Sequence, residues 1–544
     1  MTVEGVAPNV GAARAEEPDG QHPEDDSAEP EAWQRRRRTT NQWVALAGAV
    51  ATILASAGML SGVLLGPGPL RAEVQPDGAI TAMDQQVAPA NNSPLLAVDP
   101  TDSRFVVLAN RLDAPDFGCA LQVSGDGGRR WVTANPVPKL PAGAEKCYAP
   151  EVAFDAQGVV YYLFVGLQGA GNEPMGAFIT TSRDRGATFS PPRQVLGPQN
   201  FSVRMAIDPS VGKQGRIHLL WLHATVDPPL GGFGPPPNPI LTQYSDDGGQ
   251  TFSAPVRVSA RPDAHVVAPT MVLEPGGTVH VAYYDLGDDA RDYQGLEGPV
   301  WDGKWSVVVR SSHDGGVHFG PEVVAEDGII PFERVMLIFT MPPPALAVDG
   351  SRLCVAWTDA RYGDPDALAR CSGDGGRRWA PLARLNDDRQ GNGTWQYLPR
   401  LSFSPGGRLD AVFYDRRDDP DNIGTDALAT FSTDGGRTFR PNVKLSRENF
   451  DSRIGQEYAV PSAAGKVEFG SRLALVSADD HALAAWADTR NSRPVTTGQD
   501  LFGTRLELRR DRPGWARPVG AAALLVGLVV ALFVWRRPTP VREP

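Results

Sequence analysis

The chain has 544 residues, and its 52 Lys and Arg are outnumbered by 64 Asp and Glu, which gives a net charge of −12. It therefore lacks the basic footprint of a nucleic-acid-binding protein, and no nucleic-acid partner is expected. Hydrophobic residues make up 41%, which is enough for a sizeable core and excludes a chain that is disordered or fibrous throughout. The 58 Gly and 49 Pro between short runs of Val, Leu and Ala predict an all-β protein with many turns.

The N-terminal region is polar and acidic. Residues 1–34 carry nine acidic residues and one basic residue without a periodic apolar pattern, so 1–42 is predicted to be a disordered tail. The tail ends in a basic cluster, the four arginines 35–38. The uncharged segment 43–65 is long enough to cross about 30 Å of hydrocarbon and is predicted to be a transmembrane helix. A cleaved signal peptide is the alternative, but the long polar leader favours an uncleaved anchor with a cytoplasmic N-terminus.

A second apolar segment lies near the C-terminus. Residues 518–535 have no polar face, and they are followed by Arg536 and Arg537. This pattern predicts a second transmembrane helix, after which 536–544 form a short cytoplasmic tail. We therefore predict a plasma-membrane protein with both termini in the cytoplasm and an extracytoplasmic domain between the two spans.

All four cysteines lie between the two apolar segments, which agrees with an oxidising compartment. Cys354 and Cys371 fall on two segments that we interpret as adjacent antiparallel strands, and Cys119 and Cys147 flank one connection between repeated units. We predict the disulfides 354–371 and 119–147, with buried free thiols as the alternative. No metal site is predicted, because the sequence has neither CxxC spacing nor clustered His.

One motif, S-x-D-x-G-x-x-[FW], occurs six times. In the first copy Asp126 can cap backbone N–H groups, Gly128 can adopt a positive φ and Trp131 can pack against neighbouring strands, which predicts a hairpin turn. The copies begin 58, 63, 67, 60 and 60 residues apart, which leaves room for the four short strands of a propeller blade. The six copies are residues 124–131, 182–189, 245–252, 312–319, 372–379 and 432–439.

The segments around each turn repeat as well. In the fifth unit the predicted strands are 345–349, 353–357, 368–371 and 383–385. A seventh unit within 473–505 has three strand-like segments and no turn motif. Segment 72–82 is predicted to supply its fourth strand, which pairs the two ends of the domain and removes exposed sheet edges. We therefore predict an all-β seven-bladed propeller over 72–508, with six blades as the alternative.

The repeated turn resembles the Asp box, or BNR repeat, of the sialidase/neuraminidase superfamily, and the resemblance covers about 72–508. It implies a β-propeller, which in exo-α-sialidases has six blades and removes a terminal sialic acid. Those enzymes use three Arg to hold the substrate carboxylate, a Tyr nucleophile assisted by Glu, and an Asp as acid/base. The family's Arg-Ile-Pro signature is absent here, and residues 91–95 read Asn-Asn-Ser-Pro-Leu instead.

Alternating strand directions place the repeated turns on one face of the propeller. The loops between second and third strands lie on the other face, where a site is expected. Three of these loops carry an Asp followed by Arg361, Arg416 or Arg490. We predict that these arginines bind the carboxylate of an acidic sugar, because a guanidinium matches a carboxylate with two donors. The alternative is that each Asp–Arg pair orders its own loop.

The predicted catalytic set is Glu457, Tyr458 and Asp113. Glu457 and Tyr458 lie in the connection to the last unit, where a Glu beside a Tyr can supply a base and a nucleophile. Asp113 lies in a degenerate copy of the Asp–Arg feature, next to Arg111. Three arginines in comparable connections are further candidates: Arg204, Arg334 and Arg400.

No nucleotide, redox or zinc motif is present, so no cofactor is predicted. The Asp-rich loop 415–421 is interpreted as a solvated acidic loop, with a structural Ca²⁺ site as the alternative. Two functions follow from these observations. The first is a membrane-anchored exo-glycosidase that acts on terminal acidic sugars outside the cell. The alternative is a noncatalytic propeller that binds a glycan, a cell-surface polymer or a protein partner.

Overall fold

The structure is a computed structural model, and it divides into two compact units, one of which spans Ala72–Arg509. The other unit holds the two ends of the chain. The structure describes residues 43–56, 70–81, 89–134, 139–210, 212, 215–225, 238–261, 265–289, 303–332, 342–454, 456–457, 467–492, 498–510 and 516–536.

The terminal unit contains a helix over 43–56 and helix α2 (Ala516–Arg536). Within the described ranges, no helix combines the length and the apolar character needed to cross a membrane. The two transmembrane helices predicted at 43–65 and 518–535 are therefore not supported, and the described part of the first one ends at residue 56. The predicted tail 1–42 lies outside the described residues, as does all of the predicted tail 536–544 except its first residue.

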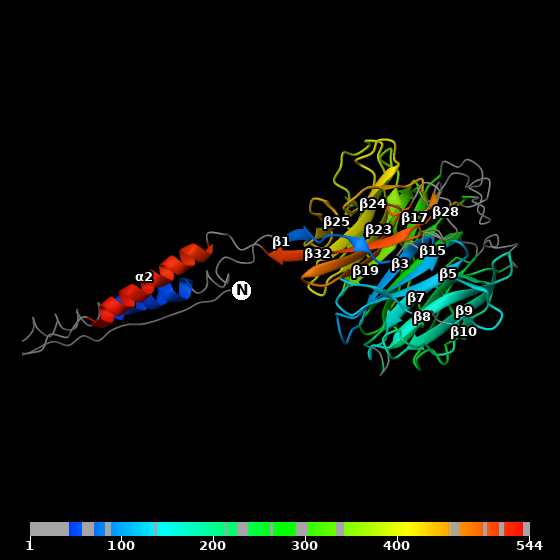
Figure 1. Ribbon diagram of the computed structural model, residues 1–544, viewed down its shortest axis with the longest axis horizontal. Coiled ribbons are helices and arrows are strands. Elements are labelled where there is room, and N and C mark those ends of the chain that lie inside the picture. The colour runs from blue at the N-terminus through cyan, green and yellow to red at the C-terminus, as the bar shows by residue number, and fades with distance from the viewer. Residues whose placement is uncertain are drawn as a thin grey trace, which may run out of the picture. The chain divides into compact units, whose positions relative to one another are not determined.

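The larger unit contains seven antiparallel sheets, each with four strands along its main path, which form the blades of a propeller. Figure 1 labels many of these strands. Blade 1 is formed by β3 (Asn91–Val98), β4 (Val106–Leu112), β5 (Gly118–Ser124) and β6 (Val132–Thr133). Blade 2 is formed by β7 (Lys146–Phe154), β8 (Val160–Gln168), β9 (Glu173–Ser182) and β10 (Arg193–Leu196). Blade 3 is formed by β11 (Asn200–Asp208), β12 (Arg216–His223), β13 (Ile240–Ser245) and β14 (Val256–Arg257).

The next three blades follow the same order. Blade 4 is formed by β15 (Val266–Glu274), β16 (Thr278–Asp285), β17 (Trp305–Ser312) and β18 (Val323–Ile329). Blade 5 is formed by β19 (Ala345–Asp349), β20 (Arg352–Asp359), β21 (Asp366–Ser372) and β22 (Ala383–Arg384). Blade 6 is formed by β23 (Gln396–Phe403), β24 (Leu409–Asp415), β25 (Gly424–Ser432) and β26 (Val443–Lys444). Three short strands follow: β27 (Phe450–Asp451), which pairs with β25, and the pair β28 (Gln456–Glu457) and β29 (Val467–Glu468).

The seventh blade joins the two ends of the propeller. It is formed by β30 (Ala474–Ser477), β31 (His481–Asp488), β32 (Asp500–Arg510) and the N-terminal β1 (Leu70–Val74). Figure 1 shows β1 in blue beside β32 in orange. The short strand β2 (Gly78–Ala79) also pairs with β32, and the Gln75 N–H donates to the Arg505 carbonyl at 2.9 Å. The predicted closure by 72–82 and the count of seven blades are confirmed, and the six-bladed alternative is wrong.

The six repeated turns share one set of hydrogen bonds. In the last copy the Ser432 hydroxyl donates to Asp434 at 2.7 Å and accepts from the Gly436 N–H at 2.9 Å, while the Thr438 N–H donates to Asp434 at 3.0 Å. The same bonds recur in the other five copies. Gly436 has φ +81°, and a Cβ there would collide with the sulfur of Cys371. The hairpin-turn prediction is confirmed.

Both predicted disulfides are present. Cys354 and Cys371 face each other in β20 and β21, and a disulfide joins them. The other disulfide joins Cys119 of β5 to Cys147 of β7, so it links blades 1 and 2. No described cysteine is free, which rules out the alternative of buried free thiols.

Large side chains of the second strands fill the space between blades. Trp221 on β12, Trp357 on β20 and Trp486 on β31 are each at most 2% exposed. The indole N–H of Trp357 donates to Asp359 at 3.1 Å, and that of Trp486 donates to Asp488 at 3.1 Å. Each Asp therefore satisfies a buried donor of its own blade, and it also begins the Asp–Arg feature of the following loop.

Candidate functional site

The first strands of adjacent blades contact each other around the axis of the propeller. In five of these strands, β3, β7, β11, β15 and β23, the pairing with the second strand shifts at a bulge. A non-glycine residue within each bulge has a φ between 49° and 54°, and these residues are Ser93, Ala149, Ser202, Ala268 and Leu398. A bulge redirects the side chains that follow it, and a positive φ outside glycine is a strained conformation that tends to mark functional regions.

Two positions after each of these positive-φ residues, where the bulge ends, a residue lines one shared cavity on the axis. These residues are Leu95, Glu151, Arg204, Thr270 and Arg400, and the remaining two blades contribute Pro343 and Arg472. The cavity therefore receives one such residue from every blade. We name this set the axial ring.

The axial cavity has a volume of about 320 Å³. It extends from the axial ring to Val98, Phe154 and Ile207, which lie at or next to the ends of their inner strands. It thus occupies the half of the axis nearer the repeated turns, whereas the sequence placed the expected site on the opposite face. The volume is at the lower end of the range of about 300–1,000 Å³ that is usual for small-molecule sites, so the cavity suits a single small ligand.

One carboxylate lies among three arginines in this cavity. Arg204 Nη1 donates to Glu151 Oε1 at 3.0 Å, and Arg472 Nη1 donates to the same oxygen. Arg472 Nη2 also donates to the Pro150 carbonyl at 3.0 Å. Glu151, Arg204 and Arg472 are 4%, 7% and 8% exposed, respectively. Buried charges of this kind require a counter-charge. Glu151 contacts two arginines, and its single negative charge balances only one of their two positive charges.

Two cationic groups keep unused donors. Arg204 Nη2 is buried and has no hydrogen-bond partner among the described residues. Arg400 is half-buried, and its guanidinium makes no hydrogen bond or ion pair within the described part of the chain. Both groups border the axial cavity, so their free donors are available to an anion that enters it.

The electrostatics of the cavity agree with this arrangement. Burial alone would raise the pKa of Glu151, but the attractions of Arg472 and Arg204 outweigh it and lower the pKa, so Glu151 is ionised at neutral pH. Burial, assisted by the repulsion from Arg472 and Arg204, lowers the pKa of Arg400 to about 10 although Glu151 opposes the shift. Arg400 is therefore charged at neutral pH but destabilised by its surroundings, and a bound anion would relieve this.

A second polar cluster adjoins the first and contains the predicted residue Asp113. Arg111 Nε donates to Asp113 at 2.6 Å, and Asn92 donates to the other Asp113 oxygen at 2.7 Å. Arg111 Nη1 donates to the Tyr148 hydroxyl at 2.8 Å. Tyr148 immediately precedes the bulge of β7. The Asp113 cluster therefore reaches the strand that carries Glu151, through Arg111 and Tyr148.

The arginines predicted to bind substrate do not line the described cavity. Arg361 Nε donates to Asp359 at 2.8 Å, and its Nη1 donates to Glu326 at 2.7 Å. Arg490 Nε donates to Asp488 at 2.9 Å, and its Nη1 donates to Asp77 at 2.7 Å. Each of these two arginines therefore pairs with the Asp of its own loop, which matches the alternative interpretation that the Asp–Arg pairs order their loops.

Arg416 has a different environment from the other two. Its Nε donates to Thr425 Oγ1 at 3.0 Å and its Nη2 donates to the Tyr397 hydroxyl at 2.9 Å. The guanidinium also lies 5.1 Å from the centre of the Trp395 ring. These partners are neutral, so none of the described hydrogen-bond partners of Arg416 is a carboxylate that balances its charge.

The remaining predicted site residues fall at the edge of the described chain. The backbone of Glu457 pairs with Val467 in the β28–β29 pair. Tyr458 and Arg334 lie outside the described residues. Of the predicted site residues, the structure brings Arg204 and Arg400 to one cavity, whereas Asp113 lies in the Arg111 cluster and is not a lining residue of that cavity.

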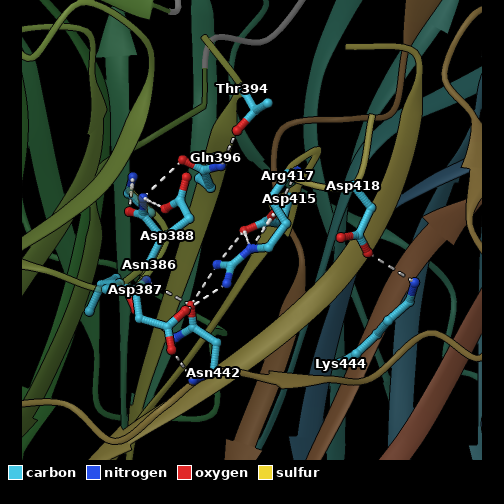
Figure 2. Close-up of polar contacts among 12 residues, drawn as sticks. Asn386, Asp387, Asp388, Thr394, Gln396, Asp415, Arg417, Asp418, Asn442 and Lys444 are labelled. Atoms are coloured by element: carbon cyan, nitrogen blue, oxygen red, sulfur yellow. Dashed lines mark hydrogen bonds and ion pairs between the residues drawn. The ribbon is translucent and has the colours of Figure 1, made fainter. Parts of the chain in front are cut away.

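The Asp-rich loop 415–421 is held by an arginine and by backbone donors. Figure 2 shows Arg417 directed toward both Asp387 and Asp415, to which it donates at 2.6 Å and 2.8 Å. Asp419 accepts the N–H groups of Ile423 and Gly424. Over the described residues, no group of three or more His, Cys, Asp or Glu is arranged to hold a metal ion. The interpretation of 415–421 as a solvated acidic loop is only partly right, because Asp418 and Asp421 are exposed whereas Asp415 is 1% exposed and pairs with Arg417.

Glu151 and Arg472 are members of the axial ring that the sequence analysis missed. Both follow a residue with positive φ by two positions, Ala149 and Gly470, respectively. The signal available in the sequence was their place at the start of the first strand of a unit, which is the criterion that selected Arg204 and Arg400.

No protein-family model and no curated protein matches the chain. Among solved structures, a protein of unknown function from Dyadobacter fermentans is 14% identical, with 81% of this chain and 99% of that chain covered and a TM-score of 0.41. A Hadza microbial sialidase is 14% identical, with coverage of 74% and 73% and a TM-score of 0.41. An ulvan lyase from a polysaccharide lyase family is 13% identical, with coverage of 79% and 95% and a TM-score of 0.46. The likeness is one of fold, and it identifies neither a substrate nor a catalytic residue.

Proposed function

We propose that the propeller acts on a glycan by binding the carboxylate of an acidic sugar in the axial cavity. The observation that carries this proposal is the set Arg204, Arg400 and Arg472 around a single carboxylate, with donors of Arg204 and Arg400 left unused. A guanidinium binds a carboxylate with two parallel hydrogen bonds. Charge-assisted hydrogen bonds are stronger in a partly buried site than at the surface, because the effective dielectric constant is lower there.

The lining of the cavity also suits a sugar ring. Leu95, Met271 and Pro343 present apolar surface beside the charged groups. Sites for small molecules combine apolar walls with a few polar groups that fix orientation. The two disulfides favour an oxidising compartment outside the cytoplasm, where extracellular glycans are found.

Binding is tested by calorimetric titration of the full-length protein. The ligands are the α-methyl glycoside of sialic acid, methyl β-glucuronide and, as the neutral control, methyl β-glucoside. We expect at least one acidic glycoside to bind and the neutral one not to bind. Arg400→Ala should weaken binding at least about tenfold, whereas Arg437→Ala, on an exposed turn of the same blade, should not. Equal affinity for acidic and neutral glycosides would contradict the proposal.

A second candidate function is hydrolysis of the terminal acidic sugar, and it is suggested by Tyr148, which lies three positions before Glu151 in β7 but is not itself one of the residues that line the cavity. Its hydroxyl accepts a hydrogen bond from Arg111 at 2.8 Å, and it stands next to the bulge that positions Glu151. A neighbouring cation stabilises a phenolate, and Tyr serves as the nucleophile in some glycosidases. Asp113 then acts as a positioning residue that holds Arg111.

Hydrolysis is tested by the release of 4-methylumbelliferone from the sialoside and the β-glucuronide. Tyr148→Phe should abolish release while the calorimetric affinity for the parent glycoside stays within about twofold, because the phenyl ring keeps its packing against Phe117. If the acidic glycosides bind but none is cleaved, the function is recognition without catalysis.

A further inference from the structure

The charges of the axial cavity do not balance. Among its described lining residues, three arginines face one carboxylate, so the cavity carries an excess of two positive charges when all four groups are ionised. Glu151 is shared between Arg204 and Arg472 through one oxygen. Uncompensated charge in a buried site is unfavourable, and a ligand with two negative charges would neutralise it.

The two unused cationic groups lie on different sides of the ring. Arg204 belongs to blade 3 and Arg400 to blade 6, which is the largest separation that a ring of seven blades allows. A ligand with one negative charge leaves one of the two excess positive charges of the cavity uncompensated, even where it reaches both arginines. A ligand with negative groups at two positions of its framework can offer one to each arginine.

The axial ring also leaves one sector free of charge. Between Arg204 and Arg400, blades 4 and 5 contribute Thr270 and Pro343, which are neutral. On the other side, Glu151 and Arg472 are bonded to each other. The sector of Thr270 and Pro343 is therefore the part of the axial ring between the two arginines where a neutral sugar ring meets no charged residue.

We infer that the cavity selects a doubly charged sugar unit, with a carboxylate and a sulfate ester on the same ring, over a sugar with one charge. This inference rests on the proposed binding of acidic glycans. In this inference the carboxylate of Glu151 is a permanent negative charge of the cavity. It therefore limits how many negative charges a ligand can add. A sulfated uronic acid has this chemistry.

The test compares four ligands of the full-length protein by calorimetry at one ionic strength. They are methyl β-glucuronide 2-sulfate, methyl β-glucuronide, methyl β-glucoside 2-sulfate and inorganic sulfate. We expect the doubly charged sugar to bind at least about tenfold more tightly than either singly charged sugar and than inorganic sulfate. The Arg400→Ala variant should lose this advantage, while Arg400→Lys, which keeps the charge, should retain most of it.

Each outcome decides the inference. Equal binding of the singly and doubly charged sugars would overturn it and leave the proposed binding of acidic sugars intact. Binding of inorganic sulfate as tight as that of the doubly charged sugar would also overturn it, because the site would then take a free anion. If no acidic sugar binds although thermal unfolding shows a folded protein, the proposed function itself fails.

Discussion

Arg204 donates from Nη1 to Glu151 at 3.0 Å, while its Nη2 has no hydrogen-bond partner among the described residues. The guanidinium is therefore half satisfied in a position that is 7% exposed. Structures usually satisfy such buried donors, and exceptions point to a missing ligand or to a functional role. The pair thus both stabilises the propeller and keeps one donor ready for an anion.

Glu151→Gln should lower the free energy of unfolding by about 3 kcal/mol, because it leaves two buried arginines without their shared counter-ion. Urea denaturation of the full-length protein measures this loss. Arg204→Met should lower stability less in the Glu151→Gln background than in the wild type, since the partner charge is already gone. Strictly additive losses would show that the two residues do not interact.

Asp77→Ala should weaken the closure of the seventh blade. Asp77 accepts from Arg490 at 2.7 Å, with side-chain exposures of 2% and 10%, and the loss of such a bond costs about 1–3 kcal/mol. Urea denaturation should detect the change, and Asp421→Ala, on an exposed loop of blade 6, is the matched control. An unchanged midpoint in Asp77→Ala would mean that this contact does not secure the closure.

Replacement of Cys354 and Cys371 by Ala should cost about 3 kcal/mol of stability, because the disulfide closes a loop with a sequence separation of 17 residues. The 119–147 disulfide, with a separation of 28, should contribute slightly more on the same model. Urea denaturation of each pair of Ala variants without reductant measures both contributions. Unchanged stability in either double variant would show that its crosslink adds nothing.

The turn carboxylates should make stability depend on pH in acid. Burial opposes the shift, but hydrogen bonds from Thr438, Ser432 and the Arg437 N–H hold the pKa of Asp434 at about 2, whereas an unfolded Asp has a pKa of about 3.9. A lowered pKa stabilises the fold above the unfolded value, and this contribution is lost as the pH falls from about 4 to about 2. The difference in Tm between wild type and Asp434→Ala should therefore be full at pH 6 and shrink across that range. A difference that stays constant from pH 6 to pH 2 would contradict it.

The sequence predicted the fold because the information for each blade is local. A turn such as Ser432–Asp434–Gly436 is held by hydrogen bonds within five residues, so the motif alone specifies it. The seventh blade lacks the motif, yet closure could be predicted because a propeller leaves no unpaired edge between its ends. The two flanking helices were recognised from composition, but their predicted membrane-spanning character is not supported by the described helices.

The candidate site was only partly predictable, because it depends on bulges and on convergence at the axis. Nothing in the sequence at Ala149 or Leu398 indicates a positive φ. The bulges at these two residues nevertheless place Glu151 and Arg400 at the cavity. Arg361, Arg416 and Arg490 stood out because they recur, whereas the cavity uses a different residue from each blade. Residues that recur in each unit indicate the architecture, whereas the positions that differ from one unit to the next form the candidate site.

The pairing of β1 with β32 also sets how the propeller would respond to mechanical load. The chain enters the propeller at Leu70 and leaves it at Arg510, on neighbouring strands of one blade. A pulling force between the two flanking segments would act on the end of this strand pair and would break its hydrogen bonds one after another. The other six blades would bear none of the load until β1 had peeled away, so the ring has a defined point of opening under tension.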